Sequence, residues 1–247
     1  CINQTGGLPW VRSLIVFFLV VALSSCEDHR INLPGQAIQS TGPKPAYAPT
    51  ITPQMLAVIE ELGRLNPVPL YTLTPQEART KPTFKDAVNS LLSKNGIAPP
   101  QARVTKSERM IPGAGGVPIR VVIYKPNGAS PTAPVIVYYH GGGWVIGNPE
   151  VYEYSTLALA QNTGAVVLSV DYRLAPENKF PTAHEDAYAA YKWVKENAAT
   201  IGGNAAKVAV AGESAGEHDG AGSWTGPARS YFICFPGSQQ RPQHAFV

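Results

Sequence analysis

The sequence predicts an α/β protein whose core is a mostly parallel β-sheet. Short apolar runs, typical of buried strands, alternate with stretches whose apolar residues recur at helical spacing. The apolar runs lie at 134–139, 165–170 and 207–211, and the helical stretches between them lie at 151–162 and 182–194. A glycine-rich segment directly follows the first run, and another follows the last. Strand–helix–strand order requires right-handed crossovers between parallel strands, so we expect a single sheet covered by helices.

Composition and charge fit one globular domain. The 247 residues are 44% hydrophobic and 15% charged, which allows a sizeable core. The net charge is +3, and the lysines and arginines are scattered without a basic stripe. Nucleic acid is therefore not an expected partner.

Residues 1–26 have the form of an export signal. Arg12 precedes an apolar run, Leu14–Leu23, which is shorter than the roughly 20 residues of a membrane span. The run ends in Leu-Ser-Ser-Cys26, which resembles the bacterial lipobox, whose cysteine is diacylated and becomes the new N-terminus. We therefore expect Cys26 to be lipidated and the protein to be an exported lipoprotein of the bacterial cell envelope, periplasmic or outer-membrane-anchored. Plain export, or a buried strand followed by a chance cysteine, are the alternatives.

The rest of the N-terminal region predicts a linker followed by helices. The first methionine is Met55, so the N-terminus as given is expected to be processed, incomplete or read from a non-standard start. The three cysteines give no disulfide pattern. Residues 27–50 are polar and rich in proline and glycine, which predicts a tether.

Residues 51–100 carry helix signals. Thr52-Pro53 begins one helix, with proline at its first position, and capping boxes are expected at Thr74–Glu77, Thr83–Asp86 and Thr182–Glu185. Apolar residues at helical spacing in the first helix are Met55, Leu56, Ile59 and Leu62. Two strands, 103–111 and 119–124, are expected around a glycine-rich turn at 112–116.

The pentapeptide Gly212-Glu213-Ser214-Ala215-Gly216 follows the last apolar run. Gly-x-Ser-x-Gly at a strand end is the nucleophile-elbow pattern, a strand-to-helix turn so sharp that glycine is needed on both sides. The turn lifts the Ser214 hydroxyl clear of the backbone and places it at a helix N-terminus, where free N–H groups favour developing negative charge. An ordinary strand-to-helix turn is the alternative for this motif alone.

The first apolar run ends in His140-Gly141-Gly142-Gly143-Trp144. Three consecutive glycines leave bare N–H groups that a substrate oxygen can approach closely, and such a loop is the partner of the elbow. The N–H of Ala215, the residue after the nucleophile, completes the set. A flexible loop is the alternative for the glycines alone.

Together these motifs resemble the hormone-sensitive-lipase-like branch of the α/β-hydrolases, the bacterial family IV esterases. The matching residues are His140–Trp144, Asp171–Glu177, Phe180-Pro181, Glu185–Ala187 and Gly212–Gly216. The resemblance covers roughly Thr52 to Gly216. It implies an α/β-hydrolase fold with helices on both faces of the sheet, a partial core at 101–217 and a helical cap at 51–100, although a plain helical extension fits that region equally.

The resemblance also implies roles for individual residues. Ser214 is the nucleophile, the N–H groups of Gly142, Gly143 and Ala215 form an oxyanion hole, and His140 and Gly141 support the loop. The implied partner is a small-molecule ester with a short acyl chain; no metal or organic cofactor is implied, and the oligomeric state is not predicted.

The chain departs from the family pattern after the elbow. The family places an acid and a histidine on loops after later strands, in the order serine, acid, histidine. His218 is only four positions from a serine that points away from its helix axis, Asp219 is too close, and His244 lies in a polar tail. Residues 218–247 show no strong period and read as an aberrant tail.

The family usually continues Gly-Gly-Asn after Ser-Ala, whereas this chain continues Gly216-Glu217-His218-Asp219. The last three codons can be GAA-CAT-GAC, which read one nucleotide later give Asn-Met-Thr. We therefore expect a frameshift at the Glu217 codon, or a truncated chain, with C-terminal strands and helices missing.

Charged residues near the motifs are expected to be structural. Asp171, Arg173, Glu177, Glu185 and Asp186 are interpreted as an ion-pair network that holds the loop after the strand, and His184 as a helix-face residue. The predicted function is a lipid-anchored serine carboxylesterase. The alternatives are an inactive ligand-binding protein of the same fold and another serine hydrolase, such as a peptidase.

Overall fold

The computed structural model describes residues 38–99 and 101–222. The expected signal and lipobox, Cys26, the first part of the linker and most of the tail lie outside the described residues. None of the described helices has the length and apolar character that a bilayer crossing requires.

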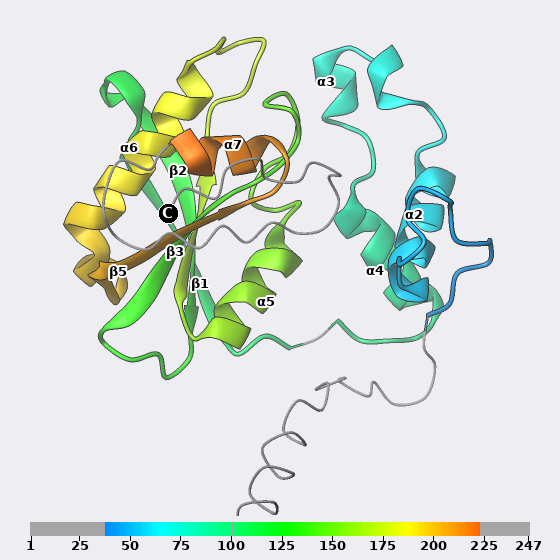
Figure 1. Cartoon of the computed structure of the whole chain (residues 1–247), viewed down its shortest axis with the longest axis horizontal. Coiled ribbons are helices and arrows are strands. Elements are labelled where there is room, and N and C mark those ends of the chain that lie inside the picture. Colours follow the sequence, from blue (N-terminus) through cyan, green and yellow to red (C-terminus); the bar gives the residue numbers. More distant parts are fainter. Residues whose placement is uncertain (1–37, 100, 223–247) are drawn as a thin grey trace, which may run out of the picture. The chain divides into compact units, whose positions relative to one another are not determined.

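A five-stranded sheet forms the core, in the order β1-β2-β4-β3-β5 (Figure 1). β3 (Ala133–Tyr139) lies between β4 (Val166–Asp171) and β5 (Gly203–Gly212), and both pairings are parallel. β1 (Val104–Pro112) and β2 (Pro118–Pro126) form an antiparallel hairpin, and β2 pairs antiparallel with β4. The predicted α/β fold is confirmed, and the hairpin adds antiparallel pairings to the parallel centre.

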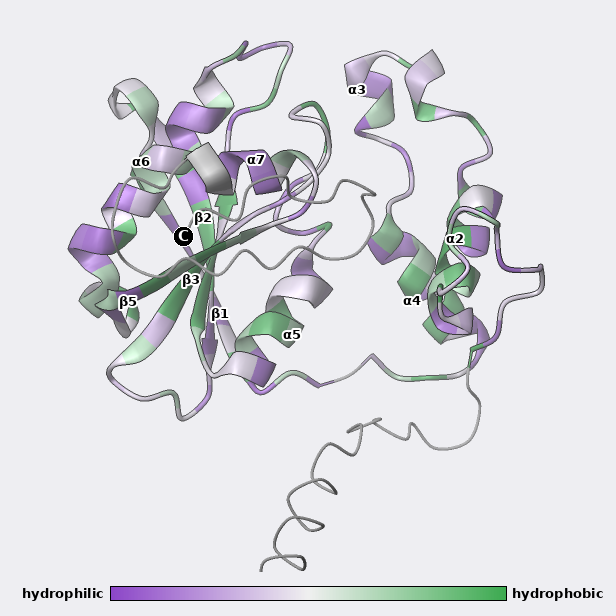
Figure 2. Ribbon diagram, viewed as in Figure 1, coloured by the Kyte–Doolittle hydropathy of each residue, from purple (hydrophilic) through white to green (hydrophobic). Residues whose placement is uncertain are grey.

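Helices cover both faces of this sheet. Alternate residues of a strand face opposite sides, so Val135 and Val137 of β3 join one apolar cluster and Ile136 and Tyr138 join the other. α6 (Thr182–Asn197) covers the first face, with Ala183, Ala187, Ala190 and Val194 in the cluster. α5 (Glu153–Thr163) covers the second face with Leu159 and Ala160. β5 is accordingly among the most hydrophobic segments in Figure 2, whereas the edge strand β1 carries several polar residues.

The N-terminal helices are α2 (Pro53–Leu65), α3 (Pro75–Ala78) and α4 (Phe84–Lys94), with a short 3₁₀ turn, η1 (Leu70–Thr72), between α2 and α3. The capping boxes at Thr74–Glu77 and Thr83–Asp86 are both present. The one expected at Thr182–Glu185 is wrong: Pro181 is the N-cap of α6 and its carbonyl accepts the Glu185 N–H.

α2 packs mainly against α4, and the buried Glu61 carboxylate between them accepts hydrogen bonds from Ser90 and Lys94. Because α2 has one main packing partner, Met55 and Ile59 of its apolar stripe remain exposed. The remaining helix, α7 (Ala215–Gly222), follows β5, and the 3₁₀ turns η2 (Ala114–Gly116) and η3 (Ala198–Ile201) lie in the β1–β2 turn and after α6.

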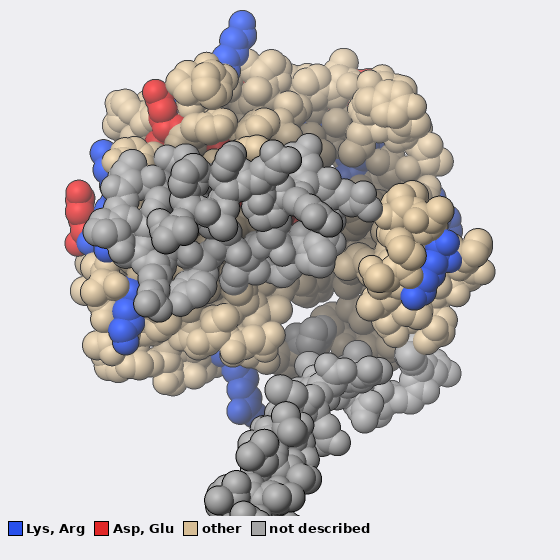
Figure 3. All heavy atoms as spheres, viewed as in Figure 1, with Lys and Arg blue, Asp and Glu red and all other residues tan. Residues whose placement is uncertain are grey.

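On the face drawn in Figure 3, lysine and arginine are spread over the surface and form no large basic patch. This distribution agrees with the scattered basic residues of the sequence.

Candidate active site

The elbow has the strained backbone that its motif predicts. Ser214 follows β5 with φ 55, in the left-handed region that favours glycine. A Cβ on Gly212 would lie 2.3 Å from the Gly216 carbonyl oxygen, and a Cβ on Gly216 would lie 2.1 Å from the Tyr139 carbonyl oxygen. Both distances are far shorter than a van der Waals contact, so glycine is required on both sides of the serine. α7 begins at Ala215, which places Ser214 at its N-terminus.

The segment after β3, residues 140–147, is called the triple-glycine loop here. Gly142 has φ 123, and a Cβ on it would lie 2.0 Å from the Ile146 carbonyl oxygen. The Gly142 carbonyl accepts the N–H groups of Val145 at 3.1 Å and Ile146 at 3.0 Å, which closes a tight turn. Gly143 has φ 62, and a Cβ on it would meet no atom within 4 Å. Close contacts therefore require glycine at position 142, whereas only the positive φ favours glycine at position 143.

The sheet register brings the elbow and the triple-glycine loop together. Tyr139 of β3 pairs with Gly212 of β5, and the Glu213 N–H donates to the Tyr139 carbonyl. Gly141 lies so close that a Cβ on it would be 2.9 Å from the Glu213 carbonyl oxygen. Two motifs that are about 70 residues apart in the sequence thus become neighbours at the carboxyl ends of adjacent parallel strands, where α/β proteins form their sites.

His140 is fully buried at the start of the loop. Its ring stacks on Tyr172 with centroids 4.2 Å apart, and Nδ1 lies 2.8 Å from the Gly141 carbonyl, to which it donates when protonated. The Tyr172 hydroxyl donates to the His140 carbonyl at 2.6 Å. Burial lowers the pKa of His140 to about 4, so the ring is neutral at pH 7. The geometry agrees with the predicted role of ordering the loop.

A cluster around Trp144 escaped the sequence reasoning. The Trp144 indole N–H donates to the carboxylate of Asp219, at 3.1 and 3.2 Å from its two oxygens. The His184 ring stacks on the indole, and its Nδ1 lies 3.5 Å from Asp219. Burial raises the pKa of the Asp219 carboxyl. His184 is thus more than a helix-face residue, because α6 and α7 together hold the triple-glycine loop by its tryptophan.

The predicted ion-pair network is present around the loop after β4, residues 172–181. Arg173 binds the fully buried Asp186, Asp171 binds Arg120, and Glu177 binds Arg79. Glu185 is exposed at the start of α6. Asp171, Glu177 and Asp186 thus form the ion pairs that were expected, whereas Glu185 forms none among the described residues.

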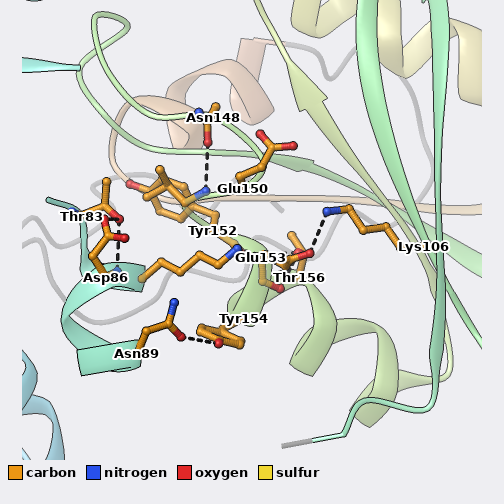
Figure 4. Close-up of polar contacts among 12 residues, drawn as sticks. Thr83, Asp86, Asn89, Lys106, Asn148, Glu150, Tyr152, Glu153, Tyr154 and Thr156 are labelled. Carbon is orange, nitrogen blue, oxygen red and sulfur yellow. Dashed lines mark hydrogen bonds and ion pairs between the residues drawn. The ribbon is translucent and has the colours of Figure 1, made fainter. Parts of the chain in front are cut away.

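Polar contacts join α4 of the N-terminal region to α5 of the core (Figure 4). Lys85 of α4 and Lys106 of β1 both bind the Glu153 carboxylate of α5. The Tyr154 hydroxyl donates to the Asn89 side-chain oxygen at 2.6 Å. These polar contacts link α4 to α5.

A general base is not found in the described part of the chain. Neither His140 nor His184 nor His218 is hydrogen-bonded to the Ser214 hydroxyl there. Within residues 38–99 and 101–222, no group of His, Cys, Asp and Glu side chains is arranged to hold a metal ion. The described residues therefore supply a nucleophile position and a glycine loop, but no partner to take the serine proton.

Comparison with known proteins identifies the fold. A family described as "alpha/beta hydrolase fold" matches residues 136–218. The carboxylesterase NlhH of Mycobacterium tuberculosis is 44% identical over 117 residues, which are 47% of this chain and 36% of that protein. Ethyl acetate hydrolase of Pseudomonas putida is 31% identical over 173 residues, covering 68% of this chain and 52% of that protein.

Solved structures agree. A hyperthermophilic esterase from the archaeon Pyrobaculum calidifontis matches with a TM-score of 0.54 and 39% identity, over 66% of this chain and 49% of that one. A thermostable esterase from Pseudomonas putida matches with a TM-score of 0.55 and 32% identity, over 67% and 49%. The chain thus spans between about a third and a half of the length of these relatives.

Proposed function

We propose that this chain, which belongs to the α/β-hydrolase superfamily and is related to its hormone-sensitive-lipase-like (bacterial family IV) esterases, is part of a serine carboxylesterase acting on short-chain acyl esters. One observation carries the proposal: the strained serine of the elbow lies beside a loop in which Gly141 and Gly142 have no room for a Cβ. The relatives named as carboxylesterases support it.

In the proposed reaction the Ser214 oxygen attacks the ester carbonyl. The N–H groups of Gly142, Gly143 and Ala215 stabilise the tetrahedral oxyanion, and loss of one such donor costs about 3–4 kcal/mol. The alcohol leaves, an acyl-serine remains, and water then releases the acid. Each step needs a base to accept and return a proton, and the family resemblance assigns that role to a histidine oriented by an acid.

Because no base for Ser214 is found in the described residues, we also propose that the reading frame changes at the Glu217 codon. The family match ends at residue 218, directly after that codon, which supports the change. A frame-restored chain is then expected to carry the acid and the histidine. Resequencing the DNA across this codon tests the frame directly.

The activity test compares the chain as given with the frame-restored chain on p-nitrophenyl acetate. The frame-restored chain is expected to release p-nitrophenol in a Ser214-dependent manner. The chain as given is expected to show almost no turnover, because removal of triad members costs up to about a million-fold in kcat. Fast turnover by the chain as given, abolished in Ser214→Ala, would show that an unrecognised base serves Ser214. No turnover by the frame-restored chain would refute the esterase proposal.

A ligand-binding protein without catalysis is the second candidate. It is favoured by the absence of a histidine on the Ser214 hydroxyl in the described residues. Saturable binding of an ester that the frame-restored chain leaves intact would support this candidate over the esterase.

Export with a lipid anchor on Cys26 is also a proposal, supported by the lipobox-like sequence that ends at this residue. It would place the enzyme in the bacterial cell envelope, periplasmic or outer-membrane-anchored.

A further inference from the structure

The short helix α3 and the turn η1 before it are held to the molecule without apolar burial. Neither element contains a buried residue, and Tyr71 of η1 is 89% exposed. The capping box of α3, between Thr74 and Glu77, is internal and attaches it to nothing else. Polar contacts must therefore hold this segment against the core.

Arg79, directly after α3, makes those contacts. Its Nε donates to the Val145 carbonyl at 2.8 Å, and one Nη donates to the Ala175 carbonyl at 2.7 Å. The two Nη groups also bind the two carboxylate oxygens of Glu177, each at 2.9 Å. Gln76 of α3 adds a bond to Glu177 at 3.1 Å. One guanidinium thus joins three segments of the chain.

Two of those segments shape the proposed oxyanion hole. Val145 lies in the triple-glycine loop, and its own N–H closes the turn onto the Gly142 carbonyl. The neighbouring Trp144 carbonyl accepts the Ala175 N–H at 2.8 Å. Arg79 therefore binds both sides of the contact between the triple-glycine loop and the loop after β4, and fixes the carbonyl of the residue that closes the Gly142 turn.

We propose that Arg79 is a positioning residue that fixes the triple-glycine loop, and hence the N–H groups of Gly142 and Gly143, from the helical N-terminal region. This inference rests on the proposed function of those N–H groups. The planar fork of arginine suits the role because its donors diverge to separate acceptors, whereas a lysine ammonium acts as a point charge. If α3 lost these contacts, the triple-glycine loop, whose N–H groups stabilise the developing negative charge, would become less rigid.

Hydrogen exchange tests the positional part on the chain as given, without any need for activity. In Arg79→Ala, the amides of Val145 and Ile146 are expected to exchange at least about tenfold faster, because local opening no longer breaks the guanidinium contacts. The exchange rates of these amides in Arg79→Lys are expected to lie between those of the wild type and of Arg79→Ala. The control is Arg64→Ala, which removes an arginine of α2 that pairs with Glu61. Exchange of the β3 amides, residues 135–139, reports the integrity of the sheet.

Faster exchange confined to residues 141–147 and 174–177 supports the proposal. Unchanged exchange there, equal acceleration in Arg64→Ala, or acceleration throughout the sheet each overturns it. The catalytic part is read in the frame-restored chain: Arg79→Ala should lower kcat by roughly 10–100-fold with KM little changed, because the N–H groups act on the transition state. A rise in KM with kcat unchanged would overturn that part. If the frame-restored chain showed no Ser214-dependent hydrolysis, the proposed function would be refuted. The hydrogen-exchange result would still decide whether Arg79 positions the loop.

Discussion

Replacement of Asp186 by alanine is expected to destabilise the core strongly, although Asp186 lies outside the catalytic motifs. Its side chain is fully buried at the start of α6. It accepts two backbone N–H groups, from Ala114 at 2.9 Å and from Arg173 at 3.1 Å. It also accepts the Arg173 guanidinium through Nε at 2.8 Å and Nη2 at 2.7 Å. One carboxylate therefore joins the β1–β2 turn, the loop after β4 and α6.

The size of the effect follows from these partners. Each backbone N–H left without an acceptor costs about 1–3 kcal/mol. The Arg173 side chain is 24% exposed, so water can replace its lost bonds and the ion pair adds little beyond about 1 kcal/mol. The expected loss is about 3–7 kcal/mol, which is a large share of the roughly 5–15 kcal/mol that stabilises a domain. For a domain of this size, that corresponds to a fall in Tm of roughly 6–28 °C.

Thermal unfolding followed by circular dichroism measures this loss. Glu185→Ala is a matched control, because Glu185 is the preceding residue, carries the same charge and is exposed. Asp186→Asn retains one acceptor oxygen and is expected to lie between the wild type and Asp186→Ala. If Asp186→Ala and Glu185→Ala unfolded within two or three degrees of each other, the role assigned to these four hydrogen bonds would be wrong.

Three further predictions concern the loop, its histidine and the anchor. Gly142→Ala should lower esterase activity of the frame-restored chain about 100–1,000-fold, because its Cβ would lie 2.0 Å from the Ile146 carbonyl oxygen, whereas Gly143→Ala meets no atom within 4 Å and should cost far less. The free energy of unfolding should fall as the pH drops from about 6.5 to 4, because His140 takes up a proton in the unfolded state but stays neutral in the folded state. His140→Gln should reduce this dependence of the unfolding free energy on pH. The mature N-terminus in a diderm bacterium should be diacylated Cys26, detected by mass spectrometry.

Each of these has a contrary outcome. Equal losses in the two glycine variants would mean that the tight turn does not position the N–H groups. Buried carboxyls with raised pKa values, such as those of Asp219 and Glu213, oppose the histidine effect, so only the difference between wild type and His140→Gln counts. If the unfolding free energy of the wild type and of His140→Gln changed equally with pH, the prediction for His140 would be wrong. If Cys26→Ser fractionated with the membrane as the wild type does, the proposed lipid anchor would be refuted.

Local patterns predicted the elements well, because they depend on neighbouring residues alone. The apolar run before Ser214 forms β5. A Cβ would collide with backbone at four glycines of the two motifs, Gly141, Gly142, Gly212 and Gly216. The capping box at Thr182 failed because Pro181 already supplies the carbonyl that starts the helix.

Contacts between distant residues were not predictable from one sequence. Arg79 meets Glu177 across 98 positions, and the Trp144 indole meets Asp219 across 75. Both depend on where the sheet brings its loops, since no local period or spacing encodes them. The general charge network near Arg173 could be anticipated from its dense carboxylates, but the four bonds to Asp186 could not.

The left-handed backbone of Ser214 sets the two candidate roles against each other. A non-glycine residue held in such a conformation costs on the order of 1–3 kcal/mol, and glycine at the same position would remove most of that cost. A protein of this fold that only bound its ligand would gain stability from a serine-to-glycine substitution at this position and would lose no function. A lineage that turns esters over must keep a hydroxyl there and tolerate a less stable fold. Under the proposed esterase function, the serine at φ 55 carries this cost because the reaction needs its hydroxyl.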